Sequence, residues 1–102
     1  MTETQLAQAY QAAKRHHKAE RLDEAEALYR RILQHSPDHP HTTQLLGLLV
    51  HQRGDHEQGL VLITEAIRRK PQVAAFHNNL GTVYKALDRL DEAEAAYRQA
   101  RA

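Results

Sequence analysis

Histidine is the residue type of this chain most able to do chemistry, because the sequence has eight histidines and no cysteine. His35, His39 and His41 lie close together in the sequence, and three imidazoles are enough to hold a zinc ion. Pro37 separates His35 from the other two, however, so the three rings cannot share one face of a single helix. The pattern therefore favours solvated surface histidines, and we predict no metal site.

Nucleophiles and phosphate-binding loops are equally scarce. The only serine, Ser36, stands beside Pro37 and lacks the glycines of a nucleophile elbow. No glycine-rich phosphate loop occurs, and the carboxylates cluster where they would stabilise the first turns of helices. The sequence therefore predicts no catalytic residue, no cofactor-binding residue and no cofactor, so we expect a protein that is not an enzyme.

Composition indicates a soluble, helix-rich chain of one small domain. Of its 102 residues, 41% are hydrophobic and 26% are charged, which suits a folded chain. The formal net charge of +1 gives no general attraction to nucleic acid. The first residues do not form a secretory signal, and the longest apolar run, 45–50, is too short to cross a bilayer. We therefore expect a cytoplasmic protein that binds neither nucleic acid nor membrane.

A period of 34 residues orders the whole chain and decides which elements must position any site. The segment 23–30 recurs with one change as 91–98, two periods later. Small residues and prolines keep the same spacing, in the sets Ala13, Gly47 and Gly81, then Ala25, Gly59 and Ala93, then Pro37 and Pro71. A fixed period of this length is typical of stacked supersecondary units that bury a shared core.

The residues at these offsets resemble the tetratricopeptide repeat, a helix–turn–helix unit. The third copy reads His77-x2-Leu80-Gly81-x2-Tyr84 and then Ala93-x3-Tyr97, and the earlier copies keep several of these positions. The resemblance implies an all-α solenoid, a right-handed superhelix of three hairpins. Repeats would span about residues 6–39, 40–73 and 74–102, and the whole chain, 1–102, would form a single domain.

The pattern predicts two helices in each repeat. The first helices, termed A, should span about residues 5–18, 40–53 and 74–87, and the second, termed B, about 22–35, 56–69 and 90–102. Asp55 should cap its B helix, and Pro37 and Pro71 should end the B helices before them. The small residues at the 34-residue spacing should lie where A crosses B. Apolar residues at helical spacing should form the core: Leu46, Leu49, Leu60, Ile63, Ile67, Leu80, Tyr84 and Tyr97.

Charge is divided unevenly between the two kinds of helix. The A helices, as predicted, contain no Asp or Glu but carry Lys, Arg and His. In the family that this chain resembles, A helices line a concave groove, so the resemblance implies a basic inner face. One stripe from each A helix would line this groove: Tyr10, Lys14, His17, His41, Gln44, Leu48, His51, Asn78, Thr82 and Lys85.

Such a face predicts a protein-interaction module, an adaptor or scaffold that binds a peptide or protein segment, and its charge favours an acidic one. Lysines and protonated histidines would attract carboxylates, while amides and hydroxyls would bond the peptide backbone. The alternative is a solvated basic face with no dedicated ligand. The carboxylate clamp of chaperone-binding family members is not matched, because Ala75 and Asn79 stand where basic residues are expected.

The third copy, whose residues 76–81 read FHNNLG, is also similar to repeats of bacterial O-linked N-acetylglucosamine transferase-like multidomain proteins. This similarity implies an alternative function, an N-terminal accessory or self-association domain of a larger enzyme such as a glycosyltransferase. No polar capping helix follows the last repeat, which leaves apolar surface near Leu90 and Tyr97. We expect either more chain in the natural protein or a homo-oligomer formed through the uncapped C-terminal helix.

Overall fold

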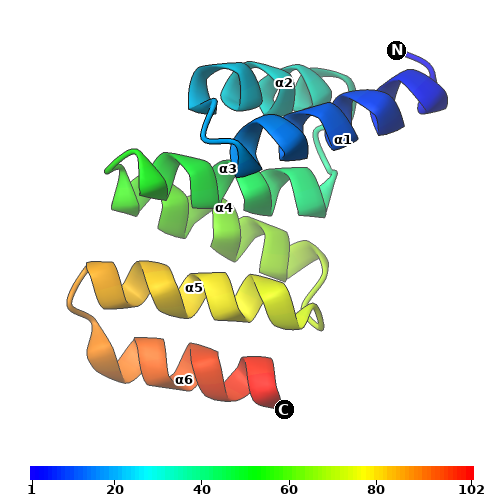
Figure 1. Cartoon of the computed structure of the whole chain (residues 1–102). Helices are drawn as coiled ribbons and strands as arrows, with labels where there is room; N and C mark the ends of the chain where they lie inside the picture. The colour runs from blue at the N-terminus through cyan, green and yellow to red at the C-terminus, as the bar shows by residue number, and fades with distance from the viewer.

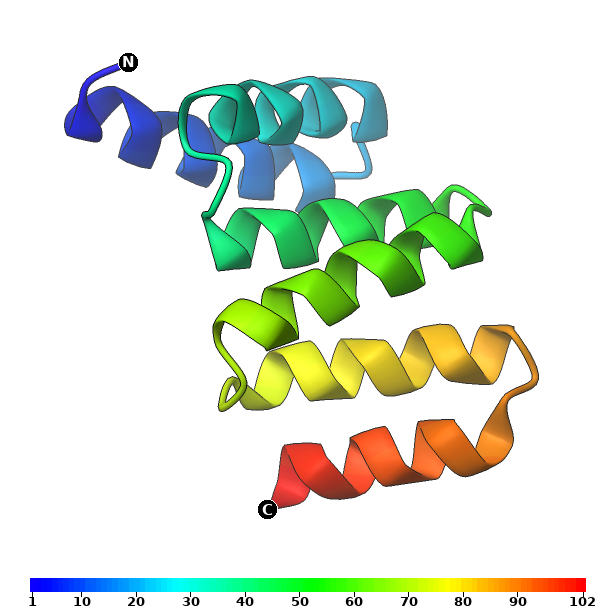
Figure 2. The same cartoon turned by 180° about the vertical axis from the view of Figure 1, so that it is seen from behind.

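Three helical hairpins stacked side by side make up the computed structural model, which describes all residues, 1–102 (Figure 1, Figure 2). The six helices are α1 (Glu3–Lys18), α2 (Leu22–His35), α3 (Pro40–Gln52), α4 (His56–Arg69), α5 (Ala74–Ala86) and α6 (Leu90–Arg101). Each A helix (α1, α3, α5) packs on the B helix that follows it, and α2 and α4 also pack on the next hairpin. The predicted all-α solenoid of helical hairpins is confirmed. None of the helices has the length and apolar character that a transmembrane segment requires.

Local sequence explains where the B helices begin and end. Asp55 caps α4 as predicted, because its Oδ1 accepts a hydrogen bond from a backbone N–H of the first turn at 3.1 Å. Helices α2 and α4 end at His35 and Arg69, just before Pro37 and Pro71, as predicted. Proline cannot donate the backbone hydrogen bond that would extend the helix through it.

The first helix is longer than predicted. Thr2 and Gln5 form a capping box, in which each side chain accepts a hydrogen bond from the backbone N–H of the other. The helix therefore begins at Glu3 rather than at residue 5. The expectation that A helices lack acidic residues is wrong for α1, since Glu3 lies in its first turn, where a negative charge is favoured by the helix dipole.

The turn inside each hairpin repeats the same hydrogen bonds around a residue in the left-handed conformation. Glu20, Gly54 and Asp88 have φ angles of 62°, 99° and 60°, respectively. The N–H of each bonds to the carbonyl three residues earlier, and the following N–H bonds to the carbonyl five residues before it. This Schellman arrangement satisfies carbonyls that the end of a helix leaves free. Of the three, only Gly54 adopts the conformation without a steric cost.

Small residues bring the A and B helices of a hairpin into backbone contact. A Cβ added to Gly59 would lie 2.8 Å from the carbonyl oxygen of Gly47, and one added to Gly47 would lie 2.9 Å from Ile63 Cγ1. In the third hairpin, a Cβ added to Gly81 would lie 2.7 Å from the ring of Tyr97. These distances are well below an ordinary carbon contact of about 3.5 Å, so neither crossing has room for a methyl group.

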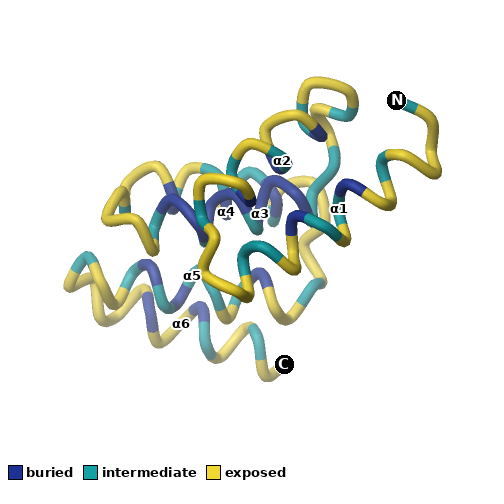
Figure 3. Tube along the Cα trace, turned by 45° about the horizontal axis from the view of Figure 1, so that its top comes forward, coloured by how far each residue is buried: buried dark blue, intermediate teal, exposed yellow.

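The core follows the interfaces between consecutive helices, as the buried stretches of the chain show (Figure 3). Its largest fully buried side chains include Tyr29, Phe76 and Ile32. The predicted core residues divide into a buried set, Leu46, Leu49 and Ile63, and a half-buried set, Leu60, Ile67, Leu80, Tyr84 and Tyr97. A small, elongated stack has much surface for its volume, so many apolar side chains lie at its margins.

An ion pair ties the first hairpin to the second. Arg53, directly after α3, lies with Nη2 2.7 Å from Asp23 and with Nη1 3.6 Å from Glu26, both on α2. All three side chains keep contact with solvent, so the pair contributes little to stability by itself. It does hold the carboxyl-terminal end of α3 beside the first turns of α2.

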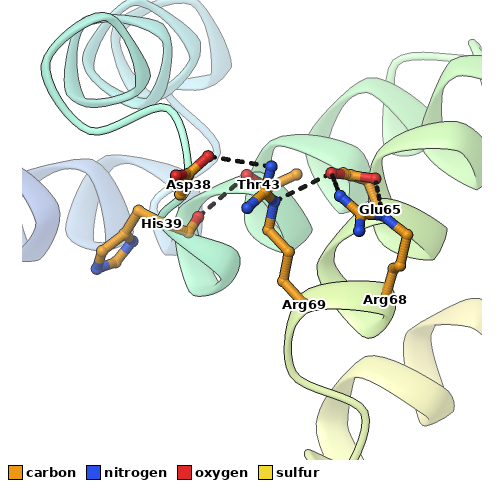
Figure 4. Close-up of polar contacts among 6 residues, drawn as sticks. All are labelled: Asp38, His39, Thr43, Glu65, Arg68 and Arg69. Atoms are coloured by element: carbon orange, nitrogen blue, oxygen red, sulfur yellow. Dashed lines mark hydrogen bonds and ion pairs between the residues drawn. The ribbon is translucent and has the colours of Figure 1, made fainter.

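A second set of charges joins the α2–α3 loop to the end of α4 (Figure 4). Arg69 lies 3.0 Å from Asp38 in the loop and 3.0 Å from Glu65 on α4, and Arg68 lies 2.7 Å from the same Glu65 carboxylate. Hydrogen bonds from Arg68 first, and then from Arg69, lower the pKa of Glu65 to about 2. The carboxylate therefore stays charged at any physiological pH.

The substitution Gly59→Ala separates helix propensity from packing. Alanine is favoured over glycine inside a helix by about 1 kcal/mol, so α4 alone would gain stability. At the α3–α4 crossing the methyl group meets the Gly47 carbonyl, and we expect a net loss of about 1–3 kcal/mol in the free energy of unfolding by urea. Thr64→Ala, on the exposed side of α4, is the control and should be neutral or slightly stabilising. A Gly59→Ala protein more stable than its parent would show that the backbones are not in contact.

The hairpin turns predict opposite effects for two substitutions. Gly54→Ala should lower the free energy of unfolding by about 1 kcal/mol, because alanine is strained at positive φ. No atom lies within 4 Å of a Cβ added there, so the effect comes from the backbone alone. Glu20→Gly relieves the same strain in the first hairpin and should raise stability by up to about 1 kcal/mol. Urea denaturation of both proteins checks the pair, and changes of the same sign would refute the explanation.

Candidate functional site

The largest hollow on the molecule lies between α1 and α3, the A helices of the first two hairpins. Its volume is about 610 Å³, within the range of ligand-binding clefts. We call it the α1–α3 groove. It is lined by Gln11, Lys14, Arg15, His17, Lys18, Glu20, Tyr29, Leu45, Leu48 and Gln52.

Equivalent positions of the two repeats provide much of this lining. Three pairs at the 34-residue spacing take part, namely Gln11 with Leu45, Lys14 with Leu48, and Lys18 with Gln52. In two of the three pairs the α1 member is polar or charged and the α3 member is a leucine. The groove is therefore amphipathic, with charge contributed by one helix and apolar surface by the other.

His17 and Tyr29 join the three helices around the groove through a short chain of hydrogen bonds. His17 Nδ1 lies 2.9 Å from the Tyr29 hydroxyl, and His17 Nε2 lies 2.6 Å from Gln52 Oε1. An amide oxygen can only accept, so Nε2 carries the hydrogen, and in the neutral ring Nδ1 then accepts from the hydroxyl. Burial, with a smaller effect of Tyr10, raises the pKa of Tyr29 and keeps its hydroxyl protonated.

Positive charge at the groove has no acidic partner within the molecule. Lys14, Arg15 and Lys18 are exposed and form no ion pair, and Glu20 is the one acidic residue in the lining. Most other arginines are neutralised by carboxylates: Arg30, Arg53, Arg68, Arg69, Arg89 and Arg98. The three cations of α1 are therefore available to a binding partner.

Three of the residues predicted to line a groove, Lys14, His17 and Leu48, come together here. Tyr10 lies one turn earlier on α1, with Lys14 Nζ 5.0 Å from the centre of its ring. The sequence prediction took a single stripe from each A helix and so missed a neighbouring stripe. The 34-residue spacing could have identified this stripe. It relates Gln11 to Leu45 and Lys18 to Gln52, and these lining residues were not predicted.

The remaining predicted residues lie outside the α1–α3 groove. Gln44 is 3% exposed, and its amide nitrogen has no hydrogen-bond partner. His51 pairs with His56 across the α3–α4 turn, their Nδ1 atoms being 2.8 Å apart. On α5, the half-buried or exposed side chains continue the A-helix row without joining this hollow: Asn78, Thr82 and Lys85.

A line of rings joins the middle of α1 to the amino-terminal ends of α3 and α5. Tyr10 contacts His39 edge-on at 5.5 Å between ring centres, and His41 contacts Phe76 in the same way at 5.1 Å. His39 also caps α3, because its Nδ1 accepts from a backbone N–H at 3.2 Å. Burial, and then the nearby charge of Lys70, lowers the pKa of His39. The neutral ring that this cap needs is therefore favoured. No group of three or more histidine or carboxylate side chains in the molecule is placed to hold a metal ion.

Two overlapping matches to the tetratricopeptide-repeat family model cover residues 10–60 and 46–102. The chain belongs to the tetratricopeptide-repeat family. This confirms the resemblance expected from the 34-residue spacing. Arrays of such repeats expose extended surfaces that bind proteins, so the fold is that of a protein-interaction module. No curated protein sequence matches the chain significantly.

Two solved structures share the arrangement of this tetratricopeptide array. The crystal structure of MamA has a TM-score of 0.81 at 18% identity, covering 93% of this chain and 56% of MamA. A mutant O-GlcNAc transferase of Thermobaculum terrenum has a TM-score of 0.83 at 29% identity, covering 98% of this chain and 20% of the transferase. The first likeness shows the fold alone. The second agrees with the predicted similarity of the third repeat to transferase repeats.

Acid should weaken the tetratricopeptide array through three histidines. Burial is the first cause that lowers the pKa of His39, His41 and His51 below the ordinary value of 6.5. The unfolded chain then binds protons more readily than the folded one, so this stability is complete above about pH 6.5 and is lost as pH falls below it. We expect the melting temperature, followed by circular dichroism, to drop between about pH 7 and pH 5.

The variant His39→Asn checks this explanation. Asparagine can cap a helix but does not titrate, so the variant should keep most of the stability at neutral pH and lose part of the acid sensitivity. His35→Asn, at an exposed histidine, is the matched control and should behave like the parent. A melting temperature that stays constant down to about pH 5 would contradict the assignment.

Proposed function

We propose that this chain is an adaptor or scaffold module that binds an acidic peptide or protein segment in the α1–α3 groove. The observation that carries the proposal is the row of unpaired cations, Lys14, Arg15 and Lys18, beside the apolar surface of Leu45 and Leu48. Carboxylates of the partner would pair with the cations while one of its apolar side chains covers the leucines. Charge would then select the partner, and apolar contact would add to the affinity.

Gln52 has a side-chain amide that could bond to the backbone of a bound peptide. Its amide oxygen is engaged by His17, which leaves the NH2 group free to donate. A carbonyl of an extended peptide lying in the groove is the natural acceptor. Gln11, exposed on the facing helix, offers a second amide. The two amides support a segment bound in an extended conformation.

A longer segment would continue along the other A helices. Asn78, Thr82 and Lys85 lie on α5, and Asn78 and Lys85 are exposed. Helix α3 contacts α5 directly, so the row of A helices is continuous from the groove to the third hairpin. The predicted residues His41 and His51 are half-buried at the two ends of α3. They border this path and would add positive charge only when protonated.

A second candidate function is an N-terminal accessory domain of a larger enzyme such as a glycosyltransferase. The observation that favours it is the 29% identity to the transferase over 98% of this chain. The chain spans only 20% of that protein, so a catalytic part would have to lie elsewhere. The sequence encoded directly after Ala102 is the test. A catalytic domain there would support this function, and a stop codon would exclude a fusion on that side.

Binding of labelled peptides tests the groove. A fluorescent decapeptide of Asp, Glu and Leu should bind, and its Asn, Gln and Leu counterpart should bind at least about tenfold more weakly by fluorescence anisotropy. Added salt should weaken the first interaction. The double variant Lys14→Glu, Lys18→Glu should raise the dissociation constant by about tenfold or more, because the groove then repels the ligand.

Arg31→Glu provides the matched control, since Arg31 is exposed and unpaired on α2, away from the groove. It makes the same change of charge as each groove substitution and should leave the dissociation constant within about twofold of the parent. Equal binding of the two peptides would refute the acidic-partner proposal. Because Arg31→Glu changes the net charge half as much as the double variant, weakening by Arg31→Glu in that proportion would show that net charge, and not the groove, determines binding.

A further inference from the structure

The first turns of α6 have the acidic and apolar character that the groove would recognise. Leu90 is 58% exposed and is one of two large apolar side chains that the molecule exposes, the other being Val61. Asp91 follows it, exposed and without an ion pair, and Glu94 is exposed one turn later. Glu94 bonds only to Arg98 of its own helix. Arg89, directly before Leu90, pairs with Glu92, so the segment presents one leucine with a single unpaired carboxylate, Asp91, beside it.

The equivalent segment of α2 shows what these side chains do when they are covered. Its residues, two periods earlier, are Leu22, Asp23 and Glu26. Leu22 packs against the core that α2 shares with α3, and both carboxylates pair with Arg53 directly after α3. The same pattern of residues thus binds an A helix through one leucine and two carboxylates. In α6 the leucine and the carboxylates have no such partner.

We propose that the first turns of α6 from one molecule occupy the α1–α3 groove of a second molecule. Leu90 would lie on Leu45 and Leu48, and the carboxylates of Asp91 and Glu94 would lie among the three cations of α1. This inference rests on the proposed function of the groove and names its occupant, a second copy of the chain. The unpaired cations of α1 and the unpaired Asp91 carry opposite charges, Glu94 is bound only within its own helix, and each surface has an apolar centre.

The positions of the two surfaces determine the kind of assembly. The groove lies between the first two hairpins, and α6 forms the far side of the third, so the two surfaces are at different ends of the stack (Figure 1). The contact is therefore head-to-tail, and each added molecule leaves a free groove at one end and a free α6 at the other. Such heterologous contacts build open chains unless the rotation closes a ring. The assembly should grow with concentration and should not stop at a dimer.

Analytical ultracentrifugation of two complementary variants tests the proposal. The tail variant Leu90→Lys, Asp91→Asn loses the acidic and apolar segment but keeps the groove. The groove variant Lys14→Glu, Lys18→Glu keeps α6. The parent should form concentration-dependent oligomers at low salt, and each variant alone should remain monomeric, with the dissociation constant raised about tenfold or more. Mixing the two variants should give complexes of one molecule of each and nothing larger, because only one intact groove and one intact α6 can meet.

Val61→Lys is the control for the Leu90→Lys part of the tail variant, because Val61 is 61% exposed on α4 and its substitution likewise replaces an exposed apolar side chain with lysine. It should associate like the parent, and loss of association in this variant would overturn the proposal. Circular dichroism checks that all variants fold.

The acidic decapeptide separates the two proposals, since the tail variant should still bind it. A parent that binds the peptide but stays monomeric in concentrated solution overturns only the self-association, whereas failure of both assays rejects the groove as well.

Discussion

The structure depends on the close approach of the two helices inside a hairpin, which glycines at the helix crossing permit. At the α3–α4 crossing Gly47 faces Gly59 with no side chain between them, and at the α5–α6 crossing Gly81 lies against the ring of Tyr97. Because α3 and α4 meet so closely, they form one unit that packs against the first hairpin through α3 and against the third through α4. Repetition of that unit places the A helices side by side in one row. The groove between α1 and α3 exists because these two helices are neighbours in the row.

The charge of the groove follows from how acidic residues are distributed. Carboxylates gather in the first turns of the B helices, where the helix dipole favours them. Carboxylates further along these helices are neutralised by arginines one turn away, as at Glu26, Glu65 and Glu94. The cations of α1 have no such neighbours, so Lys14, Arg15 and Lys18 remain unpaired although the whole chain is almost neutral. A net charge near zero therefore coexists with a surface able to attract an acidic partner.

The sequence predicted the solenoid, the ends of the B helices and the cap at Asp55, because these features depend on local spacing and on nearest neighbours. The capping box of Thr2 was missed, since it precedes the first residue of the repeat pattern. The groove was predicted only in part. Whether a side chain such as Gln44 is buried or lines a hollow depends on the angle between hairpins, and no single repeat encodes that angle. The hydrogen bonds of His17 span three helices and are equally invisible to a helical stripe.

The left-handed turns inside the hairpins have a consequence for how such a protein changes over evolutionary time. Each turn satisfies its own carbonyls with bonds to residues a few positions away, so no distant segment is required to close it. A gene duplication that adds one full 34-residue unit would therefore insert a piece that is already complete in itself. The number of repeats can therefore change in whole units, and the loss of an outer unit leaves the turn hydrogen bonds of the remaining hairpins intact.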